Sequence, residues 1–145
     1  PPVAPPSAFS MPAETLFQNA TRDRESGNFE LALREFTDYV QAYGTTEQAA
    51  SAQYYIGDIL YRLQRYQEAV TAFDMVLTNY LDSERTPDAL YMKAMAFTEL
   101  GETAKARAEF NLLIKRFKTH DLAKRAQAQL KALPATAKPA RPPSK

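Results

Sequence analysis

Apolar side chains recur every three to four residues from about residue 13 to residue 133, with polar side chains between them. This spacing predicts helices with one buried face, whereas no segment alternates with a period of two long enough to predict a strand. Gly27 and Gly101 each end one periodic segment shortly before another begins, which indicates tight turns between paired helices. The helices predicted from this pattern cover about 13–26, 29–43, 47–63, 66–80, 87–100, 103–117 and 120–133.

The sequence also repeats itself with a period of 37 residues, because the same residue types return at equivalent positions of three copies. Each copy has a small residue in its first helix, then Ala in its second helix, and then two aromatic side chains. These columns are Ala20, Gly57 and Ala94; Ala32, Ala69 and Ala106; Phe36, Phe73 and Phe110; and Tyr43, Tyr80 and Phe117. The pattern predicts an all-α, right-handed superhelical solenoid of three helix-turn-helix repeats.

The repeated columns are explained by packing. Two small side chains facing each other let paired helices approach closely, and the Phe column then fills the space between neighbouring pairs. Loss of one such ring to Ala is expected to cost roughly 3–5 kcal/mol. A final helix places Leu122, Ala126, Leu130 and Leu133 along one side. We expect it to cap the last repeat, since a terminal repeat needs a polar outer face.

The two ends of the chain differ in composition from the middle. Proline-rich and alanine-rich segments at 1–12 and 134–145 favour extended, solvated linkers around a folded domain at 13–133. The chain begins with Pro rather than Met and shows no signal peptide, so we expect a mature or excised fragment. No apolar segment approaches the length of a membrane span, which argues against a membrane-embedded protein.

Charge and reactive residues exclude several classes of function. The 18 basic and 17 acidic residues give a net charge of +1, which argues against nucleic-acid binding. The chain has no Cys and a single histidine, His120, so neither a disulfide framework nor a usual zinc site is expected. No phosphate-binding loop, nucleophile–base set or carboxylate pair is recognisable. We therefore expect a protein that is not an enzyme and that needs no metal, cofactor or small-molecule substrate.

The inner surface of the solenoid, lined by the first helices, is the predicted binding site. Phe17, Tyr54 and Tyr91 share one column of this surface, and their rings form a ladder along it unless they pack into the neighbouring repeat. Tyrosine suits peptide capture because it offers a large apolar face and one hydroxyl. Tyr55 and Met92, one residue later, are expected to be interior. The remaining candidates are Thr21, Arg24, Asp58, Tyr61, Met95 and Thr98, with Arg62 and Glu99 at the edge.

The small residue followed by Ala-x3-Phe resembles the tetratricopeptide repeat over residues 13–117. The chain departs from that pattern in its 37-residue period, in place of 34, and in the missing proline after each second helix. The usual Trp position holds Leu16, Gln53 and Leu90. Members that bind chaperones clamp a terminal carboxylate with Lys, Asn and Arg, but the corresponding positions here hold Phe17, Thr21, Asp88 and Met92.

Two segments, "AQYYIG" at 52–57 and "GETAKA" at 101–106, resemble the C-terminal domain of the Tol-Pal system coordinator family, YbgF/CpoB. The resemblance implies a periplasmic adaptor that binds TolA and couples outer-membrane constriction to septal wall synthesis during cell division. It also implies an N-terminal trimerising coiled coil, absent from this chain, through which the full protein would oligomerise. The alternatives are a BamD-like scaffold of outer-membrane β-barrel assembly, or a structural module whose outer faces self-associate.

Overall fold

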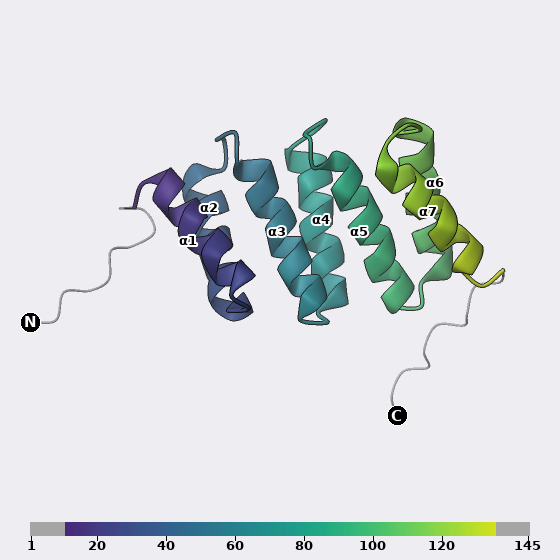
Figure 1. Ribbon diagram of the computed structural model, residues 1–145, viewed down its shortest axis with the longest axis horizontal. Coiled ribbons are helices and arrows are strands. Elements are labelled where there is room, and N and C mark those ends of the chain that lie inside the picture. The colour runs from purple at the N-terminus through teal and green to yellow at the C-terminus, as the bar shows by residue number, and fades with distance from the viewer. Residues whose placement is uncertain (1–10, 136–145) are drawn as a thin grey trace, which may run out of the picture.

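The computed structural model describes residues 11–135, and all regular structure within that range is helical (Figure 1). The predicted and observed helices agree to within two residues at each end. Pro87 lies in the first turn of its helix, where the missing N–H costs no hydrogen bond. The helices are α1 (Ala13–Glu25), α2 (Phe29–Tyr43), α3 (Ala49–Arg62), α4 (Tyr66–Asn79), α5 (Thr86–Glu99), α6 (Thr103–Arg116) and α7 (Asp121–Ala132).

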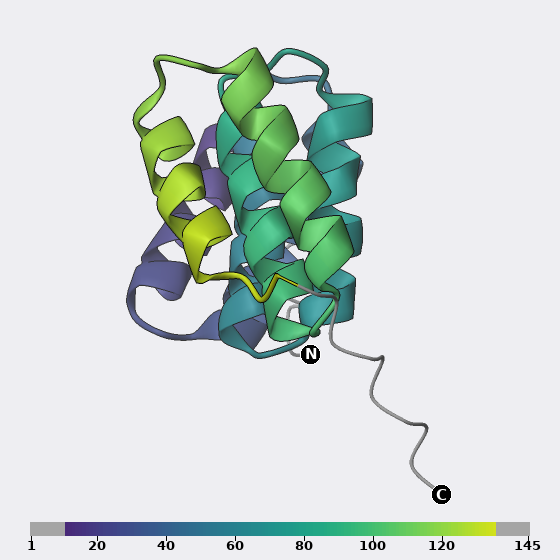
Figure 2. The ribbon, with the colours of Figure 1, turned by 90° about the vertical axis from the view of Figure 1, so that its right-hand side faces the viewer.

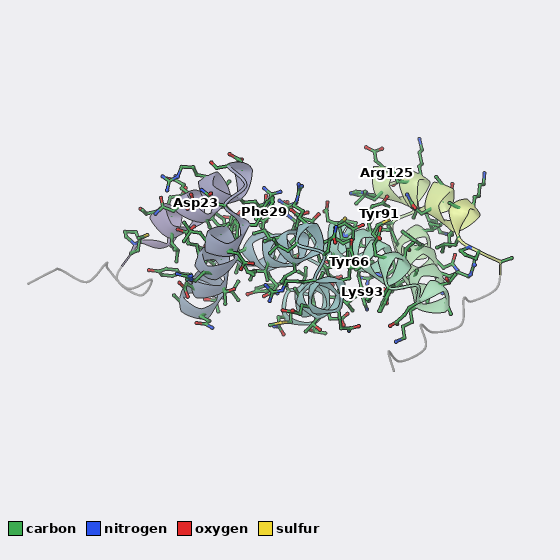
Figure 3. The ribbon with its side chains drawn as sticks, turned by 90° about the horizontal axis from the view of Figure 1, so that it is seen from below. Asp23, Phe29, Tyr66, Tyr91, Lys93 and Arg125 are labelled. Carbon is green, nitrogen blue, oxygen red and sulfur yellow. The ribbon has the colours of Figure 1, made fainter. Side chains whose placement is uncertain are left out.

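The helices form two layers that run side by side along the molecule. The layer of α1, α3, α5 and α7 faces the viewer in Figure 1, with α2, α4 and α6 behind it, and Figure 2 shows the two layers edge-on. Each helix packs against the next one in the chain, so the helices follow one another along the array in the order of the sequence. In Figure 3, α1 and α7 at the two ends lie above α3 and α5 in the middle. The layer formed by these four helices is therefore the inner, concave side of the array.

The core lies between the layers and consists of the repeated columns. Phe36, Phe73 and Phe110 are each 0% exposed, and the Ala column beside them in the second helices is equally buried. Gly57 shows why the facing residue must be small. A Cβ atom added there would lie 2.5 Å from the Phe73 ring, inside any normal contact distance. The small and aromatic columns therefore form the core as predicted, but Phe73 packs between the two helices of its own pair, whereas the Phe column was expected between neighbouring pairs.

One position in the turn within each repeat requires a left-handed backbone. Gly27 and Gly101 have φ of 82° and 73°, and Gln64 holds the same place in the middle repeat with φ of 61°. Glycine adopts this conformation without steric cost, whereas a residue with a Cβ atom pays roughly 1–2 kcal/mol. The middle turn thus keeps the geometry of the other two at the expense of some strain.

Neighbouring repeats are also joined by polar contacts. The hydroxyl of Tyr80, at the end of α4, donates to the Gly44 carbonyl of the preceding loop at 2.9 Å. Tyr43 donates in the same way to the carbonyl of Met11. Met11 therefore belongs to the folded array, and so does Pro134, whose carbonyl accepts from Arg107 at 2.8 Å. The sequence prediction placed both residues in linkers; residues 1–10 and 136–145 of those linkers lie outside the described residues.

Helix α7 covers the end of the last repeat as predicted. Ala126 is 0% exposed, and Leu122, Leu130 and Leu133 pack partly buried against the core. His120 is exposed, and its Nδ1 atom accepts from the backbone N–H of Leu122 at 3.1 Å, so it acts as the helix N-cap.

None of the helices within residues 11–135 combines the length and the apolar character that crossing a lipid bilayer requires.

Candidate protein-binding face

The aromatic column predicted for the inner layer packs against the second helices. The ring centres of Phe17 and Phe36 are 5.7 Å apart, those of Tyr54 and Phe73 are 5.7 Å apart, and those of Tyr91 and Phe110 are 5.8 Å apart. The rings therefore lean on the Phe column of their own repeats and form the floor of the inner face, in place of the predicted ladder. Phe17 and Tyr54 stay half-buried.

Tyr91 differs from the other two rings because it is only 5% exposed. The guanidinium carbon of Arg125, on α7, lies 5.0 Å from its ring centre, and Figure 3 shows the two side chains together. Of the two alternatives for Tyr91, an exposed ring or a packed one, the structure favours the packed ring, because the capping helix covers it with a cation. Met92, expected in the interior, is half-buried instead.

Two guanidinium groups meet at the ring of Tyr55 on α3. The guanidinium carbon of Arg24, on α1, lies 4.4 Å from the ring centre, and that of Arg85 lies 5.0 Å from it. Arg85 also lies 5.0 Å from the centre of the Tyr54 ring and donates to the Tyr55 hydroxyl at 2.8 Å. Tyr55 was expected to be interior, but it is half-buried and belongs to the inner face.

A buried carboxylate ties α1 to α3 beside these rings. Oδ2 of Asp58 accepts from Nε of Arg24 at 3.2 Å and from Nε of Arg62 at 3.1 Å. Asp58 is only 7% exposed, so its charge depends on those two partners. Three of the predicted candidates, Arg24, Asp58 and Arg62, therefore form one ionic cluster.

The tyrosines next to this cluster are held in their neutral form. Burial raises the pKa of Tyr54 well above its usual range, and the carboxylates of Asp58 and Asp88 raise it further. Burial also raises the pKa of Tyr61 to about 12, with Glu99 beside its hydroxyl adding to the effect. Both hydroxyls therefore stay protonated well beyond the pH at which an exposed tyrosine ionises.

Other predicted residues contribute little polar surface. The hydroxyl of Thr21 donates to the Phe17 carbonyl at 2.9 Å, and that of Thr98 donates to the Ala94 carbonyl at 2.9 Å. Both hydroxyls are thus directed to the backbone of their own helices. Met95 is half-buried.

Sequence reasoning missed Arg85 and Arg125 as parts of this face. Arg85 precedes α5, outside the helical columns from which the candidates were taken, and Arg125 lies on the helix expected to serve only as a cap. The one feature of the sequence that could have indicated Arg85 is its position directly before the predicted first helix of the third repeat. The loop before α5 brings it next to the start of α3, where it also donates to the Ser51 hydroxyl at 3.1 Å.

The outer face has a different character. An apolar groove of about 360 Å³ lies between α2 and α4, with Ile56 and Leu60 of α3 among its lining residues. At the equivalent place between α4 and α6, Lys93 binds Asp74 at 2.6 Å and Glu109 at 2.8 Å. Among residues 11–135, no group of three or more His, Cys, Asp or Glu side chains is arranged to hold a metal ion.

The chain matches models of a known family of helical repeats. Two family models, each described as a tetratricopeptide repeat, match residues 17–84 and 88–120, which together make up more than half of the chain. The chain belongs to the tetratricopeptide-repeat family. A comparison with curated protein sequences finds no match.

Solved tetratricopeptide-repeat structures share the fold. The Arabidopsis OM64 domain matches with a TM-score of 0.69 at 15% identity, over 83% of this chain and 94% of that chain. The Yersinia enterocolitica type III secretion chaperone SycD, in complex with a peptide of the translocator YopD, matches with a TM-score of 0.70 at 19% identity, over 82% and 89%. The first such domain of Spaghetti (RPAP3), bound to the HSP90 peptide SRMEEVD, matches with a TM-score of 0.67 at 12% identity, over 83% and 90%.

At these identities the likeness to solved structures establishes the fold alone. A tetratricopeptide-repeat fold is typically a non-catalytic module for protein interaction, and none of these structural matches is described as an enzyme. The inner face of this tetratricopeptide-repeat protein consists of half-buried tyrosine rings, arginine side chains placed on those rings, and one buried ionic cluster.

Proposed function

We propose that this tetratricopeptide-repeat protein is a non-catalytic adaptor that holds a segment of a partner protein against its inner face. The observation that carries the proposal is the arrangement at Tyr54 and Tyr55. Both rings are half-buried, and the stacked side chains of Arg24 and Arg85 fix their orientation. Rigid aromatic and arginine side chains lose little conformational entropy on binding, which is why they dominate binding energy at interfaces.

The structural neighbours support the class of ligand. SycD is described in complex with a peptide of YopD, and the Spaghetti domain is described as bound to an HSP90 peptide. A peptide is also the ligand that fits the chemistry of this face, because guanidinium groups and half-buried ring surfaces lie next to each other at Tyr54 and Tyr55.

For the biological setting we propose the periplasm and the Tol-Pal system, with TolA as the partner and the coordination of outer-membrane constriction with septal wall synthesis as the role. The support is the resemblance of residues 52–57 and 101–106 to that family of coordinators. The first of these segments contains Tyr54 and Tyr55, so the stretch that suggests the family also supplies the centre of the proposed site.

Calorimetry with the periplasmic region of TolA tests both levels of the proposal. Tyr54→Ala is expected to weaken binding at least tenfold, because the variant removes a central aromatic anchor. Met75→Ala, on the outer face, is the matched control, since Met75 is 40% exposed and lies away from the inner layer. Thermal melting of each variant separates lost binding from lost folding. Equal weakening by both variants, or unaltered binding by Tyr54→Ala, contradicts the inner-face site; no binding by the parent chain contradicts TolA.

A further inference from the structure

The cations of the inner face outnumber the carboxylates that contact them. Arg24, Arg62, Arg85 and Arg125 belong to this face, and three of them lie 4.4–5.0 Å from a tyrosine ring centre. Arg24 and Arg62 share the single carboxylate of Asp58. Neither Arg85 nor Arg125 has a carboxylate oxygen within 4.0 Å among residues 11–135.

Arg85 is the clearest case. Its guanidinium group donates to two neutral oxygen atoms, the hydroxyls of Ser51 and Tyr55, at 3.1 and 2.8 Å. It is half-buried, so water compensates its charge only in part. Arg24 approaches the same Tyr55 ring, and the two like charges therefore lie close together over one aromatic side chain.

The outer face provides the contrast. Lys93 is a single cation with two carboxylates, Asp74 and Glu109, within 2.8 Å. Its charge is fully compensated within the fold, and it serves to join α4, α5 and α6. In Figure 3, Lys93 and Tyr91 lie on opposite sides of the α5 layer, so the compensated and uncompensated cations face different surfaces.

Negative charge is present on the inner face but does not contact Arg85. Asp88 and Asp58 both raise the pKa of Tyr54, whereas Arg85 and Arg24 lower it, so these four charges surround one hydroxyl. Asp58 is already bonded to Arg24 and Arg62, and Asp88 makes no ion pair within 4.0 Å to Arg85. Three guanidinium groups of this region therefore have one directly bonded carboxylate among them.

We propose that the surface formed by Arg24, Tyr54, Tyr55 and Arg85 binds an acidic segment of the partner protein, with a Glu or Asp side chain held by Arg85. The inference rests on the proposed function and adds the chemistry of the ligand. Nε–H and one Nη2–H of Arg85 already donate to Ser51 and Tyr55, so its remaining N–H groups, on Nη1 and Nη2, are the ones that would bind a carboxylate with paired, charge-assisted hydrogen bonds. Apolar side chains of the segment then contact the rings of Tyr54 and Tyr55.

Three synthetic peptide pools test this chemistry without requiring the natural partner. Every peptide in a pool has twelve residues, with an aromatic or aliphatic side chain at every second position. The pools differ only in the residue at the positions between, which is Glu, Gln or Lys. Binding is followed by fluorescence anisotropy and by the amide and arginine Nε–H signals of the labelled protein. We expect the Glu pool to bind at least tenfold tighter than the others and to shift the signals of Tyr54, Tyr55 and Arg85.

Variants of Arg85 test the assigned contact. Arg85→Gln is expected to reduce the affinity for the Glu pool about tenfold, the loss of one charge-assisted contact. Arg85→Lys keeps the charge and recovers part of the affinity, and it also serves if the Gln variant folds poorly. Arg34→Gln, an exposed arginine of α2, is the control that removes a charge elsewhere and leaves the affinity unchanged.

The outcomes separate this inference from the proposed function. If the Gln or Lys pool binds the inner face as tightly as the Glu pool, the acidic ligand is refuted while peptide binding by this face stands. If Arg34→Gln weakens binding as much as Arg85→Gln, binding depends on the overall positive charge of the protein, and Arg85 does not hold the acidic side chain. If none of the pools shifts an inner-face signal, both the inference and the inner-face function are contradicted.

Discussion

Replacing Gly57 with Ala tests how closely the paired helices of the middle repeat approach. An added Cβ atom would lie 2.5, 2.6 and 2.8 Å from three carbon atoms of the Phe73 ring. Real Cβ atoms do not approach this closely, so the ring or the helix has to shift. Phe73 is 0% exposed and surrounded by core side chains, which makes that shift costly. The first and third repeats hold Ala at this place, so the close approach is special to the middle one.

The expected cost follows from two opposing effects. Overpacking a core typically costs about 1–3 kcal/mol, whereas Ala favours a helix over Gly by about 1 kcal/mol. The net loss is therefore up to about 2 kcal/mol, which corresponds to a decrease in Tm of up to roughly 8 °C for a domain of this size. Without the contact with Phe73, the same substitution would stabilise the protein.

A double-mutant cycle measured by urea unfolding provides the assay. Phe73→Leu alone should destabilise the protein, because a buried ring is lost, but it should also make room for a Cβ atom at position 57. The double variant Gly57→Ala with Phe73→Leu is then more stable than the sum of the single effects predicts, by about 1 kcal/mol or more. Stabilisation by Gly57→Ala alone, or strictly additive effects, would refute this account of the interface between α3 and α4.

Three further changes have expected outcomes. Gln64→Gly should raise the free energy of unfolding by about 1 kcal/mol in urea melts, because φ is 61° there and the other repeats have Gly at that place; a loss of stability would contradict strain in this turn. Burial, with the Asp23 carboxyl beside it, raises the pKa of Glu35 from 4.5 to about 7. The native state thus holds this proton more tightly than the unfolded state. Its contribution to stability is complete below pH 4.5 and is lost as the pH rises through 7. Because solvent screens this half-buried group, we expect a decline on the order of 1 kcal/mol between about pH 5 and 8, which Glu35→Gln should abolish; an unchanged slope in that variant would assign the decline to other groups. Lys93→Met should lower Tm by several degrees, since it leaves two partly buried carboxylates, Asp74 and Glu109, facing each other; an unchanged Tm would mean that this bridge adds nothing to the joint between the repeats.

Most of the fold could be predicted from the sequence because the same helix-turn-helix pattern occurs three times. A period of 37 residues fixes which positions are equivalent, so one buried Phe implies two more, and Gly27 and Gly101 mark equivalent turns. Departures from the repeat were harder to interpret. Gln64 occupies the left-handed turn position in the middle copy, where the residue type does not indicate that conformation and only the distance of 37 residues from Gly27 and Gly101 does.

The candidate site was readable only in part, because side-chain contacts between repeats do not follow from helical periodicity. The columns placed Arg24, Asp58 and Arg62 near one another, but the convergence of the two arginines on the Asp58 carboxylate depends on the distance between α1 and α3. The covering of Tyr91 could not be inferred, since it requires the position of Arg125 on the capping helix. Arg85 lies outside the helical pattern altogether, and only the course of the loop between α4 and α5 brings it to Tyr55.

The most direct test of the central claim is a titration of the isotope-labelled protein with the periplasmic region of TolA, with amide shifts followed residue by residue. The account predicts shifts that cluster at Tyr54, Tyr55, Asp58 and Arg85 on the inner face. Shifts confined to the outer helices α2, α4 and α6 would contradict the inner face as the binding surface. Unchanged spectra at millimolar TolA would contradict TolA as the partner.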